Sequence, residues 1–335
     1  MLKYILKRLF ISIFVLLGVS IIIYFLVRLM PNDYLDQKFE SQLSQGTITP
    51  EQLLEFKRQY GLADNSFMGI VEGYFTWLGN MLKGDLGYSF KYLEPVSTVI
   101  GKNMWISFAI AIVATILQFA IAIPLGITSA THQYSKRDYA VTIFTMIGIS
   151  LPTYFFAAIM IKFFAVELEL FPTGGLQSAG ETFTDDFAGS MKKFLDMAHH
   201  LVLPITCTVI LSLGGLMRYT RTNTLEVLNA DYIRTARAKG LSEKKVIYKH
   251  AFRNTMIPLV TLLAGILPSL FGGMMITEEV FAIDGIGRIA YNALREGDVP
   301  FVMGYNMFLA ILSVIGTLLS DIMYSIVDPR VKLSK

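Results

Sequence analysis

Residues 9–27 read "LFISIFVLLGVSIIIYFLV" and contain no charged side chain. A helix needs about 20 mostly apolar residues to cross the hydrocarbon core of a bilayer, so this stretch is long enough to span a membrane. Lys3, Lys7 and Arg8 precede it, as basic residues precede the core of a signal peptide. The apolar run is too long for a signal peptide, however, and "MPND" at 30–33 offers no small-residue cleavage site. We therefore expect a retained transmembrane helix here.

The composition of the whole chain agrees with a membrane protein. Of its 335 residues 53% are hydrophobic and only 16% are charged, whereas about 25% of residues are charged in a typical soluble domain. Five further stretches satisfy the hydropathy criterion, at Ile106–Ala130, Tyr139–Ile161, Leu201–Met217, Met256–Thr277 and Phe301–Ser320. The sequence thus predicts an all-α polytopic membrane protein with six transmembrane helices.

The Lys and Arg residues predict how these helices are oriented, because cytoplasmic loops are enriched in them. Nine Lys or Arg residues and only three acidic ones lie between Arg218 and Arg253, and the N-terminus, "SKRD" at 135–138 and "DPRVKLSK" at 328–335 are also basic. The loops 166–200 and 278–300 are predominantly acidic. This alternation predicts a multi-pass protein of a bacterial or archaeal plasma membrane, with both termini in the cytoplasm.

This topology divides the chain into an N-terminal helix (1–30), an extracytoplasmic segment (31–101) and a core domain with five helices (102–335). In the outer segment, "TPEQLLEFKRQYG" at 49–61 predicts a short helix that Thr49 caps and Gly61 ends. "FMGIVEGYFTWLGNMLKG" at 67–84 predicts an amphipathic helix with Tyr74 on its apolar face. We expect it to lie on the membrane surface or pack on the spans; lining a substrate entrance is the alternative.

The sequence lacks the motifs of several common enzyme and ligand-binding sites. The only Gly-Lys pair, Gly101–Lys102, is followed by Asn103, so there is no P-loop for ATP, and zinc-protease and serine-hydrolase motifs are also missing. The single cysteine, Cys207, excludes an intrachain disulfide. The adjacent His199 and His200 suit polar contacts better than a metal site. The spans are almost free of charged residues, which argues against an ion-driven carrier or a selective ion channel. We predict no catalytic residue and no metal site.

The most polar loop, "DYIRTARAKGLSEKKVIYKHAFRNTMIP" at 231–258, predicts two helices joined by a glycine turn. Asp231 is expected to cap the first helix, Gly240 to end it in a left-handed conformation, and Ser242 to cap the second. A basic loop of this kind can rest on anionic lipid headgroups. Lipid attraction does not explain the small residues Ala236 and Gly240, which permit a close approach by another surface. A cytoplasmic protein partner explains both the basic charge of the loop and its small residues.

This loop resembles the cytoplasmic signature of the permease subunits of ATP-binding-cassette (ABC) importers, which has the form E-A-A-x-x-x-G followed later by an apolar residue and proline. Ala236, Gly240 and Ile257–Pro258 match it; the missing Glu and first Ala are typical of the oligopeptide/dipeptide/nickel branch. The resemblance is collinear and covers nearly the whole chain, at "GDLGYS" (84–89), "SLPTYFFA" (150–157), "EEVFAIDGIGR" (278–288) and "DPR" (328–330). It is greatest to the B-type permeases, with their long outer segment.

The resemblance implies a type I ABC importer permease fold and a set of partners. These are a second homologous permease in a heterodimer, two cytoplasmic ATPase subunits that bind ATP and Mg²⁺, an extracytoplasmic binding protein or lipoprotein, and membrane lipid, without nucleic acid. This chain itself would hold no cofactor. Within the coupling loop 218–255, the residues implied to contact an ATPase subunit are Asp231, Tyr232, Arg234, Thr235, Ala236, Arg237, Ala238, Lys239, Gly240 and Leu241.

The expected function is the import of oligopeptides or dipeptides along a path whose lining the sequence does not identify. Uncharged spans suit a wide passage that leaves selectivity to the binding protein. Nickel, a metal chelate or heme is the alternative cargo within the same branch. A stand-alone channel or secondary carrier is the alternative from another class, and an intramembrane enzyme is a distant third.

Overall fold

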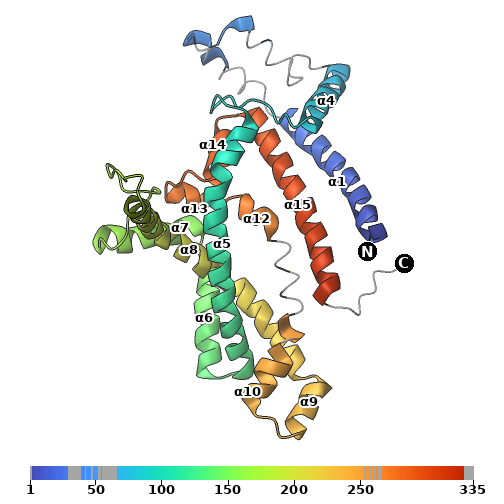
Figure 1. The fold of residues 1–335 in the computed structure, drawn as a ribbon, viewed down its shortest axis with the longest axis vertical. Helices are drawn as coiled ribbons and strands as arrows, with labels where there is room; N and C mark the ends of the chain where they lie inside the picture. Colours follow the sequence, from blue (N-terminus) through green and yellow to red (C-terminus); the bar gives the residue numbers. More distant parts are fainter. Residues whose placement is uncertain are drawn as a thin grey trace. The chain divides into compact units, whose positions relative to one another are not determined.

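The computed structural model describes residues 2–28, 39–41, 43–46, 48–51, 54, 66–252, 254–256, 259, 262 and 266–327. The regular structure in these ranges is helical, apart from one isolated antiparallel bridge between Tyr88 and Pro95 (Figure 1). The helices are α1 (Leu2–Arg28), α4 (Phe67–Leu82), α5 (Val96–Thr131), α6 (Lys136–Ser150), α7 (Thr153–Met160), η1 (Ile161–Glu167), α8 (Phe187–Leu228), α9 (Asp231–Ala238), α10 (Glu243–Lys245), η2 (Val246–Ala251), α12 (Leu267–Phe271), α13 (Met275–Val280), α14 (Ile286–Arg295) and α15 (Val299–Val327).

Four of the described helices are long and apolar enough to cross a membrane, namely α1, α5, α8 and α15. The bent pair formed by α6 and α7–η1 makes a fifth if it is counted as one span. Part of the expected fifth span, Met256–Thr277, lies outside the described residues, as do Arg253 and the "DPR" motif. The all-helical, multi-span architecture is therefore observed, while the count of six stays a prediction.

The expected third span, Tyr139–Ile161, was wrong as a single helix. Helix α6 ends at Ser150, and the next helical segment leaves at an angle of 106°. Leu151 is extended, with φ −86° and ψ 131°, and Pro152 follows with φ −61° and ψ 137°. Proline has no N–H to donate and pushes the preceding residue out of the helical region, so "LP" at 151–152 breaks the span.

The expected fourth span, Leu201–Met217, is only the middle of a much longer helix. Helix α8 has 42 residues, begins after the N-cap Asp186, whose carboxylate accepts a hydrogen bond from the Gly189 N–H at 2.8 Å, and contains Pro204. It packs along α6 (Figure 1). The Gln118 side chain of α5 donates to the Ser212 carbonyl of α8 at 3.0 Å, so this polar group deep in a span holds two helices together.

The described end of the expected fifth span is interrupted. Helix α12 stops at Phe271, Gly273 has a φ of +74°, and α13 begins only at Met275. A Cβ on Gly273 would lie 2.4 Å from the Gly287 nitrogen. The positive φ and this close backbone approach both require glycine, and together they turn the chain back before "EEVF" at 278–281.

The described chain divides into two compact units, residues 1–104 with 289–318, and residues 105–288 with 319–335. The first contains a core of α1, α4 and α15 side chains, including Tyr24, Tyr74, Trp77 and Met303. The predicted helix at 67–84 is confirmed as α4, and it packs on α1, where the Tyr74 hydroxyl lies 2.8 Å from the Ser20 hydroxyl. The helix predicted at 49–61 lies largely outside the described residues.

In the second unit α5 and α8 pack closely together at Gly126. Two glycine substitutions in α5, one at this contact and one away from it, test the packing. A Cβ on Gly126 would lie 2.7 Å from the Thr220 Cβ and 2.8 Å from the Met217 carbonyl oxygen, whereas a Cβ on Gly101 of the same helix would meet nothing within 4 Å. We expect Gly126→Ala to destabilise the protein by about 1–3 kcal/mol because the helices must separate. Gly101→Ala is expected to be neutral or stabilising by about 0.5–1 kcal/mol. Thermal unfolding of the two purified variants in detergent checks both; equal midpoints would contradict the packing.

Candidate functional site

The predicted helix–turn–helix at 231–251 is present in the structure. Helix α8 ends at Leu228, and Ala230, extended at φ −71° and ψ 148°, leads into α9. The prediction that Asp231 caps this helix was wrong by one position, because Ala230 occupies the cap and Asp231 lies in the first turn. There its carboxylate still favours the positive end of the helix dipole, and it lies 3.7 Å from the Arg234 guanidinium.

The turn after α9 is confirmed as a left-handed glycine turn. Gly240 has a φ of +75°. Its N–H donates to the Arg237 carbonyl at 2.9 Å, and the Leu241 N–H donates to the Ala236 carbonyl at 3.4 Å. This pair of bonds is the Schellman motif, which satisfies carbonyls that the helix end would leave without partners. The turn fixes the direction in which the chain leaves α9.

The two helices of this element share a small apolar core. Ile233 and Ala236 of α9 are buried together with Val246 and Ala251 of η2, and Leu241 packs against them. Ala236 is only 7% exposed. Its small side chain therefore serves packing within the chain, and of the two small residues only Gly240 lies at an open surface, with nothing within 4 Å of a built Cβ.

The opposite face of α9 is open to solvent in this chain. Asp231, Arg234, Thr235 and Ala238 are exposed, and their spacing puts them on the side of the helix away from Ile233 and Ala236. Lys239 and Gly240 continue this surface into the turn, and Tyr232, at 46% exposure, flanks it. The element therefore presents one buried face to its own chain and one mixed polar face outward.

Polar bonds hold the two helices together outside the apolar core. The Arg237 guanidinium donates to both carboxylate oxygens of Glu243, with Nη2–Oε1 at 2.6 Å and Nε–Oε2 at 3.2 Å. This hydrogen bonding lowers the pKa of Glu243 and raises that of Arg237. The Asn254 amide donates to the Tyr232 hydroxyl at 2.9 Å. Ser242 occupies the predicted cap position of α10, but its hydroxyl makes no capping hydrogen bond.

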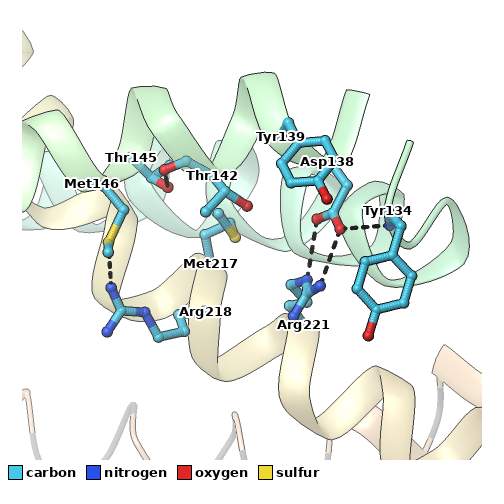
Figure 2. Close-up of a pocket in the computed structure, with 9 residues that line it drawn as sticks. All are labelled: Tyr134, Asp138, Tyr139, Thr142, Thr145, Met146, Met217, Arg218 and Arg221. Atoms are coloured by element: carbon cyan, nitrogen blue, oxygen red, sulfur yellow. Dashed lines mark hydrogen bonds and ion pairs between the residues drawn. The ribbon is translucent and has the colours of Figure 1, made fainter. Parts of the chain in front are cut away.

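A second polar cluster, between α6 and α8, was not found from the sequence (Figure 2). Asp138, 4% exposed, receives the Arg221 guanidinium through two hydrogen bonds at 3.0 and 3.2 Å, the Tyr134 N–H at 3.0 Å and the Ser129 hydroxyl. In the sequence Asp138 stands within the basic "SKRD" turn. Its partner Arg221 comes 83 positions later, so only the packing of α6 on α8 shows the pair.

A buried carboxylate explains the structural role of two residues in the "EEVFAIDGIGR" motif, Glu278 and Gly285. Glu278 of α13 is fully buried and accepts hydrogen bonds from the Ser107 hydroxyl at 2.7 Å, the Met274 N–H at 2.9 Å and the Arg288 N–H at 2.9 Å. A Cβ on Gly285 would lie 2.5 Å from one of its carboxylate oxygens. Glu278 thus ties the turn between α13 and α14 to α5, and the glycine makes room for it.

The two histidines of α8 have protein hydrogen-bond partners. The His199 ring lies 2.9 Å from the Leu170 carbonyl, and the His200 ring lies 2.9 Å from the Asp196 carbonyl. Asp196 also accepts from the Ser178 N–H and hydroxyl at 2.8 and 2.6 Å. His199 and Asp196 therefore join loop 168–186 to α8, and His200 bonds within α8, as the polar-contact interpretation expects.

Residues 122–333 match the family described as "binding-protein-dependent transport system inner membrane component", and residues 1–113 match its N-terminal region. The chain is 37% identical over 99% of its length to all of the oligopeptide transport system permease protein AppB of Bacillus subtilis. It is 31% identical, over 99% of its length, to all of OppB of Haemophilus influenzae, also named an oligopeptide transport system permease protein.

A solved structure shows the same kind of fold. The inward-facing MetNI methionine ABC transporter contains a chain that aligns with 69% of this one, and with 97% of its own length, at a TM-score of 0.51 and 18% identity. That likeness concerns the fold alone, and it agrees with the predicted permease architecture. With two family matches that together span most of the sequence and full-length relatives above 30% identity, the chain belongs to the inner membrane components of binding-protein-dependent transport systems, and it is a multi-pass transport subunit rather than an enzyme.

Proposed function

We propose that this chain is a permease subunit of an ATP-driven importer of oligopeptides or dipeptides. The observation that carries the proposal is its full-length similarity to AppB and OppB, whose names give oligopeptide transport as their system. The aligned regions cover both the membrane-spanning helices and the loop with α9. The cargo therefore follows from relatives that share the chain's whole length.

The assembly proposed for this function has further subunits. A second homologous permease would complete the translocation path as a heterodimer. Two ABC ATPase subunits would bind ATP and Mg²⁺, since the sequence offers no P-loop of its own. An extracytoplasmic binding protein or lipoprotein would deliver the peptide. The basic loops support a cytoplasmic location for both termini and α9, on the side of the ATPases.

The outward face of α9 is the proposed contact with an ATPase subunit. The glycine turn, the buried Ile233 and Ala236, and the Arg237–Glu243 bonds support this role because they make α9, α10 and η2 one stiff unit. A stiff unit transmits a displacement at Arg234 or Ala238 to α8 rather than absorbing it. ATP-driven closure of the ATPases would then move the helices between two arrangements.

Reconstituted transport tests the proposal. The chain is purified with its second permease and ATPases and placed in proteoliposomes, the binding protein is added, and uptake of a labelled peptide is measured with ATP or ADP. We expect peptide uptake only with ATP. Uptake of a nickel chelate or heme without peptide uptake would reject the peptide cargo. Peptide uptake without the ATPases would reject the ATP-driven mechanism.

A further inference from the structure

A cleft of about 290 Å³ opens between α6 and α8, with the Asp138–Arg221 pair at one end (Figure 2). Along α6 its lining changes from Asp138 and Tyr139 to Thr142 and then Met146, and Met217 lines it from α8. Asp138 and Met146 are eight positions apart, which corresponds to about 12 Å along the helix. The cleft therefore has the ion pair at the end near the α5–α6 turn, whereas at the Met146 end the apolar lining is joined by the Arg218 side chain (Figure 2).

The ion pair at the polar end is already complete. Asp138 accepts from Arg221, from the Tyr134 N–H and from the Ser129 hydroxyl, so its carboxylate has no capacity left for a second cation. Arg221 is likewise engaged through two nitrogens. The pair contributes no net charge to the cleft.

Arg218 lies one helical turn from Arg221 and lines the same cleft. Its Nη2 donates to the Met146 Sδ at 2.7 Å. Among the residues that the structure describes, no carboxylate lies within the 4.0 Å ion-pair distance of Arg218. A thioether sulfur is a weak acceptor for a guanidinium with five N–H donors. The cleft thus holds one exposed positive charge whose geometry suits an oxygen anion such as phosphate.

The apolar side of the cleft continues onto the outer surface of α6. Ile143 and Ile147 are 58% and 54% exposed, and Phe144 is 52% exposed. In a membrane-spanning chain such a surface faces acyl chains or another helix. A phospholipid joins an anion to hydrocarbon, and the Met146 end of the cleft with this surface joins the Arg218 guanidinium to apolar side chains. Basic clefts between transmembrane helices are known sites for anionic lipid headgroups.

We propose that the α6–α8 cleft binds an anionic phospholipid, with its phosphate on the Arg218 guanidinium and an acyl chain along Met146 and the exposed face of α6. The bound lipid would replace the thioether as the partner of Arg218 and cover the apolar end of the cleft. It would also bridge α6 and α8 beside the Asp138–Arg221 pair, on the side away from α9, because Arg218 precedes Arg221 in α8.

Native mass spectrometry of the full-length protein, titrated with phosphatidylglycerol, measures this binding directly. Arg218→Gln is expected to weaken the tightest phosphatidylglycerol site about 10-fold, since a charge-assisted contact is lost. Arg137→Gln is the matched control, because Arg137 is an exposed arginine of α6 that does not line the cleft. Arg221 is unsuitable for this test, since its removal would leave the buried Asp138 without its cation.

Four results would overturn the proposal. Equal weakening by Arg218→Gln and Arg137→Gln would mean diffuse attraction of lipid to a basic surface. Equal binding of phosphatidylcholine would mean that the headgroup charge is not recognised. Displacement of the lipid by inorganic phosphate at similar concentrations would mean that the acyl chain is not recognised. Unchanged lipid binding with weakened assembly to the second permease would mean that a protein surface covers the cleft.

Discussion

Replacing Ala238 with tryptophan is expected to reduce ATP-driven uptake about 10- to 100-fold while leaving the chain folded. Ala238 is exposed on the face of α9 that points away from the chain's own core. A bulky side chain at this exposed position is tolerated by the isolated chain, but it would overfill a fitted contact with an ATPase subunit at a cost of about 1–3 kcal/mol. Uptake and transport-stimulated ATP hydrolysis in proteoliposomes measure the loss, and the yield of purified protein measures folding.

The matched control is Thr222→Trp, which adds a bulky side chain at an exposed position of α8 before α9 begins. It is expected to leave uptake near the original level. Ala238 is a cleaner probe than Gly240, whose φ of +75° makes any side chain strain the turn itself. Full activity of Ala238→Trp in a correctly assembled complex would exclude the outward face of α9 as the contact.

The largest loss of stability is expected from Glu278→Ala. Removing this fully buried carboxylate leaves the buried Ser107 hydroxyl and the partly buried Met274 and Arg288 N–H groups without their acceptor. Buried donors without partners cost about 1–3 kcal/mol each, so we expect a loss of about 3–5 kcal/mol. That is a large part of the stability of an ordinary protein. Thermal unfolding in detergent, followed by tryptophan fluorescence, measures it.

The adjacent Glu279 supplies the comparison. Its carboxylate pairs with Arg288 at 3.1 Å, and its side chain is 35% exposed. Such partly exposed ion pairs contribute about 0–1 kcal/mol, so Glu279→Ala should change the unfolding midpoint little. Glu278→Gln keeps one acceptor oxygen and should lie between the two. If Glu278→Ala and Glu279→Ala unfolded at the same temperature, Glu278 would not hold the α13–α14 turn in place.

Local signals in the sequence predicted much of the architecture. Apolar runs located α1, α5, α8 and α15, and the position of Gly240 after a polar helix predicted the left-handed turn that the structure contains. The predicted bounds of the third and fourth spans were wrong, because a local feature there overrides hydropathy. Pro152 breaks an apolar run that is long enough to be a span, and α8 extends past its apolar part into the polar residues up to Leu228.

Interactions between distant residues could not be predicted from the pattern. Asp138 looks like one acid in a basic turn until α6 packs on α8, and Glu278 looks like an acidic loop residue until Ser107 of α5 meets it. Ala236 illustrates the same limit. Its spacing from Gly240 suggested two small residues at an intermolecular contact, whereas it lies in the core shared by α9 and η2. Burial on one face of a short helix depends on where the next helix folds back.

Cysteine cross-linking tests the contact between α9 and an ATPase subunit most directly. The only native cysteine, Cys207, is buried, so a cysteine introduced at an exposed position supplies the reactive thiol. Ala238→Cys is combined in the assembled complex with a short cross-linker, and Thr76→Cys on the exposed face of α4, expected on the opposite side of the membrane, is the control. We predict a permease–ATPase adduct from position 238 and none from position 76. No adduct from position 238 in a complex that transports peptide, or an equal yield from position 76, would contradict the account.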